Sequence, residues 1–279
     1  DEATVLVVDA IGEFETTTIW HGQGNKLDKI WRQYYPKSLG LFYSAITHRV
    51  GLKPNEEEYI LMGMAAYGDP YKYYKAMFPL LEENLHRGCR WWMPDAHGQQ
   101  DTYDMAASAQ LIYEEEFEML LRKARLWNTS KNLVIMGGCA LNCVANNLAL
   151  KYFDNVWIMP APGDAGSAIG AALDKKVEWT GPYLGYDIQG DYPINKTIQE
   201  LKKNKIVGVA NGRAEFGPRA LGNRSLFADP RGIQVKDQVN EIKRRQKFRP
   251  FSPVIMEEHA QYYFNMPIKQ SPYMQYVFH

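Results

Sequence analysis

Short apolar runs and longer periodic stretches alternate along this chain. An apolar run at residues 5–8 ends in a Gly-containing turn, and a β-branched segment follows at 15–20, a pattern typical of a β-hairpin. Residues 26–62 predict helical and irregular structure, in which the clearest helix spans 41–50. Apolar residues that recur three and four positions apart predict a long helix at 104–126.

The middle of the chain alternates strands with helices. Strands are predicted at 132–136 and 155–159, and each leads through a turn into a helix, at 140–152 and 165–173 respectively. Strands that alternate with helices of this length are typical of α/β architecture. The sequence therefore predicts the α/β fold class.

A stretch rich in Gly, Pro and Tyr at residues 181–193 predicts a linker. Beyond it, a short helix at 198–203 and a strand at 206–210 begin a second α/β unit. The sequence thus predicts two domains, residues 1–180 and 194–279. Because the chain begins and ends inside apolar runs, we expect it to be a piece of a longer protein.

The charge is unevenly distributed along the chain. Residues 211–249 hold ten Lys/Arg and four Asp/Glu, a net charge of +6 in a chain whose total is zero. Gly and Pro are interleaved with these cations, above all in Gly217-Pro218 and in the Phe-Arg-Pro-Phe run at 248–251. Glycine lets backbone N–H groups approach a ligand, and arginine offers a planar fork of donors to phosphate or carboxylate. The pattern predicts a pocket for a small anion.

Two other interpretations of the basic segment stay open on composition alone, a solvated basic face and a nucleic-acid patch. A solvated face rarely needs Gly-Pro and Phe-Arg-Pro-Phe among its charges. A nucleic-acid surface is more often rich in Lys and carried by a basic domain, whereas this chain has a pI of about 7.2. We therefore expect no nucleic-acid partner.

Composition narrows the class of protein further. Apolar residues make up 46% and charged residues 23% of the chain, as in ordinary soluble domains. No run approaches the roughly 18 apolar residues of a membrane span. Three cysteines are too few for a disulfide framework or for a four-ligand zinc site. We expect free thiols, no membrane partner and a reducing, cytoplasmic location.

Polar residues and glycines follow several of the predicted strands. Asp9 and Asp164 are each either structural, as a turn former or a helix N-cap, or functional, as a carboxylate at a sheet edge. The two could share one metal if the sheets that carry them face each other across a cleft. Gly137-Gly138 forms either a tight turn or a loop whose N–H groups bind an anion or nucleotide. The Walker A and GxGxxG patterns are absent.

Taken together, seven motifs resemble those of the carbamoyltransferase family of NodU/CmcH type. They occur in the order found in that family, and they span nearly the whole chain. The motifs are residues 7–13 (VVDAIGE), 62–68 (MGMAAYG), 137–146 (GGCALNCVAN), 160–172 (PAPGDAGSAIGAA), 215–225 (EFGPRALGNRS), 243–253 (KRRQKFRPFSP) and 271–274 (SPYM).

The resemblance implies a fold and a two-step chemistry. Residues 1–180 resemble the later part of an actin/Hsp70-type ATPase-like domain, and residues 194–279 resemble the start of a YrdC-like domain. The YrdC-like site is expected to make carbamoyl-adenylate from carbamoyl phosphate and ATP, with release of pyrophosphate. The ATPase-like site is then expected to pass the carbamoyl group to the hydroxyl of a small-molecule acceptor. The implied cofactors are ATP, with Mg²⁺, and an iron-type divalent metal, Fe²⁺. A homodimer is a candidate assembly.

The resemblance also implies roles for individual residues. Arg219, Lys243 and Arg249 are expected to contact carbamoyl phosphate. Asp9 and Asp164 match the two carboxylate metal ligands of the family. The remaining expected contacts are Gly137, Gly138 and Asn142 on the adenosine side, and Arg213, Arg224, Ser225 and Arg245 as supporting or nucleotide contacts.

The chain departs from the family pattern at a few positions. Ala10 stands where the family usually has Gly, and Ile60 stands about where it often has Lys. A His-rich HxxxH motif would precede Asp9, and a further substrate-binding Arg would follow Met274. We therefore expect the chain alone to lack two metal ligands and part of its anion pocket, and to be inactive by itself. The alternative functions are a threonylcarbamoyl- or hydrogenase-maturation-type relative and a non-catalytic nucleotide-binding module.

Overall fold

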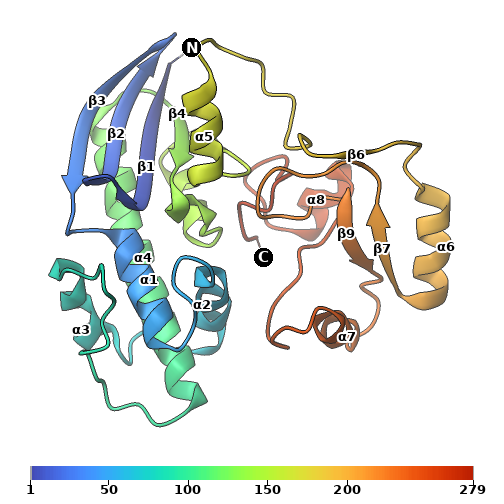
Figure 1. The fold of residues 1–279 in the computed structure, drawn as a ribbon, viewed down its shortest axis with the longest axis horizontal. Coiled ribbons are helices and arrows are strands. Elements are labelled where there is room, and N and C mark those ends of the chain that lie inside the picture. The colour runs from blue at the N-terminus through green and yellow to red at the C-terminus, as the bar shows by residue number, and fades with distance from the viewer. Residues whose placement is uncertain (1, 279) are drawn as a thin grey trace.

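The computed structural model describes residues 2–278, which form two units connected by an extended segment (Figure 1). The strands of the first unit are β1 (Glu2–Gly12), β2 (Glu15–Gln23), β3 (Lys26–Tyr34), β4 (Asn132–Met136) and β5 (Asn155–Ile158). They form one mixed sheet in the order β3-β2-β1-β4-β5. The predicted hairpin and the two predicted central strands are thus confirmed, as is the α/β class.

The direction of the strands determines where the polar loops gather. Strands β1 and β2 are antiparallel, as are β2 and β3, whereas β1, β4 and β5 run parallel to one another. Parallel strands end at the same edge of a sheet, and in α/β folds that edge carries the binding sites. The segments that follow β1, β4 and β5 therefore leave the sheet side by side.

Strand β3 corrects the prediction of helical and irregular structure at its residues. It is an edge strand that pairs only with β2, and most of its side chains are exposed. Charged pairs hold it in place, since Lys29 Nζ lies 2.7 Å from the Glu15 carboxylate and 4.6 Å from the centre of the Trp20 ring. Apart from the partly buried Trp31, this edge strand contributes little to the core, so it lacks the alternating apolar pattern of a half-buried strand.

Helices cover the sheet of the first unit and continue beyond it. The α-helices are α1 (Leu39–Arg49), α2 (Glu58–Met64), α3 (Tyr74–Met77), α4 (Gln99–Trp127) and α5 (Asp164–Ala172). The 3₁₀ turns are η1 (Ala65–Tyr67), η2 (Phe78–Glu82), η3 (Gly138–Leu141) and η4 (Ala145–Lys151). The predicted helices at 41–50, 104–126 and 165–173 are confirmed within a few residues.

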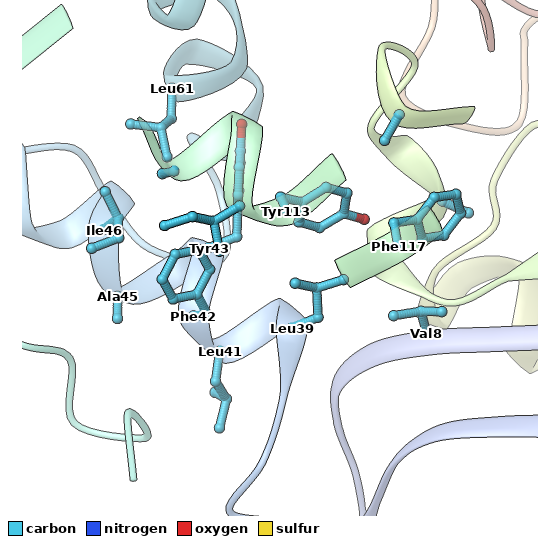
Figure 2. Close-up of a cluster of buried hydrophobic side chains, with 14 of the residues drawn as sticks. Val8, Leu39, Leu41, Phe42, Tyr43, Ala45, Ile46, Leu61, Tyr113 and Phe117 are labelled. Carbon is cyan, nitrogen blue, oxygen red and sulfur yellow. The ribbon is translucent and has the colours of Figure 1, made fainter. Parts of the chain in front are cut away.

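The main core lies where α1, α2 and α4 meet the sheet (Figure 2). Tyr43 of α1 contacts Tyr113 of α4 edge to face, with ring centroids 5.1 Å apart, and Phe117 stacks on Tyr113 at 6.0 Å. Val8 of β1 is fully buried in the same cluster. The polar edge of the sheet therefore lies next to a closely packed apolar core.

The predicted helix at 140–152 is replaced by the 3₁₀ turns η3 and η4. Two asparagine side chains compete there with the backbone for hydrogen bonds. The Asn142 Oδ1 atom accepts from the Ala145 N–H at 3.1 Å, and the Asn146 side-chain amide donates to the Ala140 carbonyl at 2.9 Å. The helical prediction therefore holds only in the tighter 3₁₀ form, in two pieces, and it was wrong in expecting one continuous helix.

The second unit is built from two small sheets and three helices. Its elements are β6 (Asp187–Ile188), α6 (Ile194–Asn204), β7 (Ile206–Ala210), β8 (Gly212–Arg213), β9 (Arg224–Ala228), α7 (Val235–Ile242) and α8 (Glu257–Tyr263). Strands β7 and β9 form an antiparallel ladder, and β6 pairs with β8. Part of the predicted linker is therefore a strand of the second unit. Between residues 2 and 278, no helix is long and apolar enough to cross a membrane.

Candidate functional site

The turn after β4 is the tightest point of the polar sheet edge. Gly137 has φ +92, and a Cβ atom there would lie only 2.1 Å from the Val8 carbonyl oxygen. Its N–H donates to the Pro162 carbonyl in the segment after β5, at 2.8 Å. Only glycine can occupy this position, because both the backbone angle and the space exclude a side chain. The turn therefore joins the segments that follow all three parallel strands.

Asp9, at the end of the paired part of β1, lies directly beside this turn. Its Oδ1 atom accepts from the Ala10 N–H at 2.8 Å, and the Gly138 N–H also donates to the carboxylate. A Cβ on Gly138 would come within 3.2 Å of Asp9 Oδ1. Burial, together with the nearby negative charge of Asp164, raises the pKa of Asp9 despite these N–H donors.

Helix α1 fixes the backbone around Asp9. Ser38 caps the helix by accepting from the Leu41 N–H at 3.0 Å, and its hydroxyl donates to the Ala10 carbonyl at 2.6 Å. A Cβ on Gly40 would lie 2.6 Å from the Ala10 backbone nitrogen, so helix and turn are in direct contact. Ala10 does not have positive φ, and alanine therefore fits where the family usually has glycine.

Asp164 is the first residue of α5 and is exposed to solvent. Gly163 occupies the N-cap position, so the N-cap interpretation of Asp164 is wrong. Both aspartates come from one sheet edge, and no cleft between two sheets is needed to bring them together. A divalent cation could take one oxygen from each. Among residues 2–278, however, no three His, Cys, Asp or Glu side chains gather into a metal site, so further ligands would have to come from elsewhere.

The Asn142 side chain is buried, and both its amide oxygen and its amide nitrogen form hydrogen bonds. Its amide exchanges two hydrogen bonds with Gln110 of α4, at 3.1 and 3.0 Å. Gln110 in turn accepts from the Tyr43 hydroxyl at 2.7 Å and donates to Glu114 at 2.8 Å. This network anchors the loop after β4 on α4. Sequence reasoning missed Gln110, because nothing in the helical pattern distinguishes it from a surface residue.

The loop of residues 215–225 is organised around its own acidic residue. One carboxylate oxygen of Glu215 accepts from the N–H groups of Leu221, Asn223 and Arg224, at 2.7, 2.9 and 3.3 Å. Burial opposes ionisation, but these N–H donors hold the pKa of Glu215 below its usual value. The backbone amides of this glycine-rich turn thus bind an internal anion. Sequence reasoning did not predict this role for Glu215.

Arg224 and Ser225 are also used within the fold. The Arg224 guanidinium donates to four backbone carbonyls, at distances of 2.7 to 3.1 Å. The Ser225 hydroxyl accepts from the Gly222 N–H at 2.8 Å. Arg213 is exposed in β8, opposite Asp187. Arg224 and Ser225 thus shape the loop, whereas the Arg213 side chain is exposed.

Arg219 reaches from this loop to the first unit. Its guanidinium donates to the Leu141 carbonyl at 3.3 Å and lies beside the Cys143 thiol. The loop itself presses against the segment after β5, because a Cβ on Gly217 would lie 2.9 Å from the Pro160 carbonyl oxygen. Arg219 is therefore placed at the boundary between the two units, next to the loop of Gly137, Gly138 and Asn142.

A second group of cations follows α7. Arg245 donates through Nε to the fully buried Asn240 and through Nη2 to the Pro250 carbonyl, and its guanidinium lies 4.3 Å from the Phe251 ring. Arg249 lies over the ring of Tyr59, at 4.5 Å. Partial burial and the neighbouring charges of Arg245 and Arg249 lower the pKa of Lys243. No carboxylate of the described residues pairs with Lys243 or Arg249.

The structure thus places most of the expected residues in two groups. Asp9, Asp164, Gly137 and Gly138 share the sheet edge, and Arg219 lies at its border. Lys243, Arg245 and Arg249 form a separate cluster against α2. Ile60, in the same helix, is 2% exposed and packs in the core. The three cysteines are free, as predicted.

Family models match most of the chain. The model described as "Carbamoyltransferase N-terminus" matches residues 1–92 and 88–173. The model described as "Carbamoyltransferase C-terminus" matches residues 198–279.

Curated relatives resemble the chain over most of its length. An uncharacterized protein of Synechocystis sp. is 36% identical over 346 residues, covering 99% of this chain and 55% of that protein. The nodulation protein NolO of Bradyrhizobium diazoefficiens is 32% identical over 327 residues, covering 99% and 59%. A 3'-hydroxymethylcephem-O-carbamoyltransferase of Amycolatopsis lactamdurans is 32% identical over 247 residues, covering 77% and 47%. The chain therefore spans about half the length of these relatives.

Proposed function

Because this chain belongs to the carbamoyltransferase family of NodU/CmcH type, we propose that its protein transfers a carbamoyl group to the hydroxyl of a small-molecule acceptor. The observation that supports this most directly is the cluster of Lys243, Arg245 and Arg249, where like charges crowd together without a carboxylate. Such a cluster is stabilised by binding an anion, and carbamoyl phosphate and ATP are both polyanions.

The first half of the proposed reaction takes place in the second unit. Water cleaves carbamoyl phosphate into carbamate and inorganic phosphate, and a carbamate oxygen then attacks the α-phosphorus of ATP and displaces pyrophosphate. Lys243 and Arg249 would bind the phosphate oxygens, and Arg219 would reach the same anion from the boundary between the units. Arg213, Arg224, Ser225 and Arg245 would support this pocket or the nucleotide. Charge neutralisation and positioning are the main contributions a protein makes to phosphoryl chemistry.

The second half takes place at the sheet edge of the first unit, for which an ATPase-like fold is part of the proposal. Gly137 and Gly138, on the loop that Asn142 anchors, would hold the adenosine side of the adenylate. Asp9 and Asp164 would supply two oxygen ligands to a divalent metal of the iron type. When bound, such a metal polarises an acyl carbonyl and orients the attacking alcohol.

The test of this proposal is pyrophosphate release from ATP by the full-length protein, with carbamoyl phosphate and no acceptor. Release that requires carbamoyl phosphate is the expected result. Arg219→Ala should abolish it without changing the fold, whereas Asp164→Ala should leave it intact and block only transfer to the acceptor. A folded protein that binds ATP but releases no pyrophosphate would overturn the proposal and favour a non-catalytic nucleotide-binding module.

A further inference from the structure

The guanidinium of Arg249 is held in an unusual way for an arginine in a crowded loop. Its side-chain nitrogens donate no hydrogen bond to any residue between 2 and 278. Its contact is with the ring of Tyr59, whose centroid lies 4.5 Å from the guanidinium carbon. Tyr59 belongs to α2 in the first unit, whereas Arg249 belongs to the second unit. The two residues are 190 positions apart in the chain.

This mode of contact keeps the hydrogen-bonding edge of Arg249 free. A cation–π contact uses the flat face of a guanidinium, and the N–H groups point outward in its plane. The neighbouring Arg245 shows the opposite arrangement, because its Nε and Nη2 donate to Asn240 and Pro250. An arginine held by a ring contact, with its N–H donors unused within the fold, is positioned in advance for a bidentate contact with a phosphate.

The surface of η1 and α4 holds the backbone next to Arg249. The Phe248 ring packs against the rings of Tyr67 and Tyr103, with both centroid distances at 6.0 Å. The Tyr67 hydroxyl donates to the Phe248 carbonyl at 3.2 Å. Phe248 fixes the chain, and this leaves Tyr59 as the group that fixes the direction of the Arg249 side chain.

We propose that Tyr59 is a positioning residue of the anion site, supplied by the first unit to the cation cluster of the second. The ring of Tyr59 holds the Arg249 guanidinium in place, so that its unused N–H groups can bind the ligand. The anion site is therefore incomplete without α2. This inference rests on the proposed function for the identity of the anion, but the placement of Arg249 can be tested with inorganic phosphate alone.

The experiment compares three variants of the full-length protein by calorimetric titration with inorganic phosphate. Tyr59→Leu should weaken phosphate binding roughly 10-fold, the size of a partly desolvated cation–π contact. Tyr59→Phe keeps the aromatic face and should bind within about twofold of the wild type. Tyr71→Leu, at a tyrosine that is 73% exposed, is the matched control and should change nothing. In the pyrophosphate assay, Tyr59→Leu should raise KM for carbamoyl phosphate more than it lowers kcat.

A double-mutant cycle separates positioning from a general structural effect. In an Arg249→Ala background, Tyr59→Leu should produce no further loss of phosphate affinity, because its partner is gone. The inference is overturned if Tyr59→Leu binds phosphate like the wild type, or if its effect persists without Arg249. Failure of the proposed function looks different: the wild type binds phosphate and responds to Tyr59→Leu, but releases no pyrophosphate.

Discussion

Two basic segments of the second unit use their charges in opposite ways. In residues 213–225 the Arg224 guanidinium donates to four backbone carbonyls. The Glu215 carboxylate accepts hydrogen bonds from the backbone N–H groups of the turn. In residues 243–251, Lys243 and Arg249 have no carboxylate partner among the described residues, and the Arg249 guanidinium is held over the Tyr59 ring without a side-chain hydrogen bond. The first segment is largely satisfied from within, whereas the second still has charge to offer a ligand.

This difference shows that the number of arginines in a motif does not measure its capacity for ligands. An arginine whose N–H groups donate to backbone carbonyls has as few donors left for a ligand as one that already binds a phosphate. The more conspicuous Gly- and Arg-rich segment is mainly a scaffold that presents Arg219 to the first unit. The following predictions test the comparison, beginning with the largest expected effect.

Arg249→Ala should weaken phosphate binding by about 2–3 kcal/mol, roughly 30- to 150-fold in Kd, because a charged bidentate donor is lost. The free energy of unfolding should fall by no more than about 1 kcal/mol, the size of the lost cation–π contact, since the side chain makes no hydrogen bond within the described chain. Calorimetric titration and urea denaturation measure the two quantities. Lys236→Ala, an exposed cation of α7, is the charge-matched control. Equal losses in both variants would show that only net charge matters.

Arg224→Ala should show the reverse behaviour. Four carbonyls lose their donor, and the free energy of unfolding should fall by roughly 2–4 kcal/mol, because each lost bond contributes about 0.5–1.5 kcal/mol. Phosphate affinity, measured in buffer where the variant is still folded, should change less than about threefold. A variant that is fully stable but no longer binds phosphate would reverse the assignment of the two segments.

Glu215→Gln should have a smaller effect on the same loop. The amide oxygen still accepts from the turn, but the charge that strengthens these bonds is lost, which costs about 1 kcal/mol. Amide hydrogen exchange at Leu221 and Asn223 measures the loosening directly. Unchanged exchange at both amides would mean that the turn holds its shape without the carboxylate.

The smallest expected effect is the pH dependence of the stability that Glu215 contributes. A carboxyl whose pKa is lowered in the folded state stabilises the protein above its unfolded pKa, about 4.3 for Glu. This contribution disappears as the pH falls through the folded value. The difference in unfolding free energy between wild type and Glu215→Gln should therefore be constant near pH 7 and shrink below pH of about 4. A difference that grows on acidification would contradict the lowered pKa of Glu215.

The fold was predictable wherever a segment buries a face in the core. The hairpin, the two parallel strands and helix α4 all carry apolar residues at the period of their structure, because the core selects that pattern. Strand β3 was missed because most of its side chains are exposed at the sheet edge, so that the core does not impose an alternating apolar pattern on it. The 3₁₀ turns η3 and η4 were missed because Asn142 and Asn146 act through single hydrogen bonds, which no periodicity records.

The candidate site was predictable only where it follows from strand direction. Asp9, Gly137 and Asp164 meet because β1, β4 and β5 are parallel, and strand-and-turn reasoning locates the ends of such strands. Tyr59 and Gln110 contribute through contacts between segments far apart in the chain, and a single sequence carries no signal for these. The roles proposed for the cations remain predictions until binding is measured.

The close approach of Gly217 to Pro160 has a consequence for how the protein can be divided. Further contacts between the two units are made by Arg219, Phe248 and Gln275. The two units therefore bind each other through many non-covalent contacts besides the segment that connects them. The connection between them runs through exposed residues at 174–178. A chain severed there should yield two halves that reassemble when co-expressed, which would make the family a natural candidate for split-enzyme reporters of carbamoyl transfer.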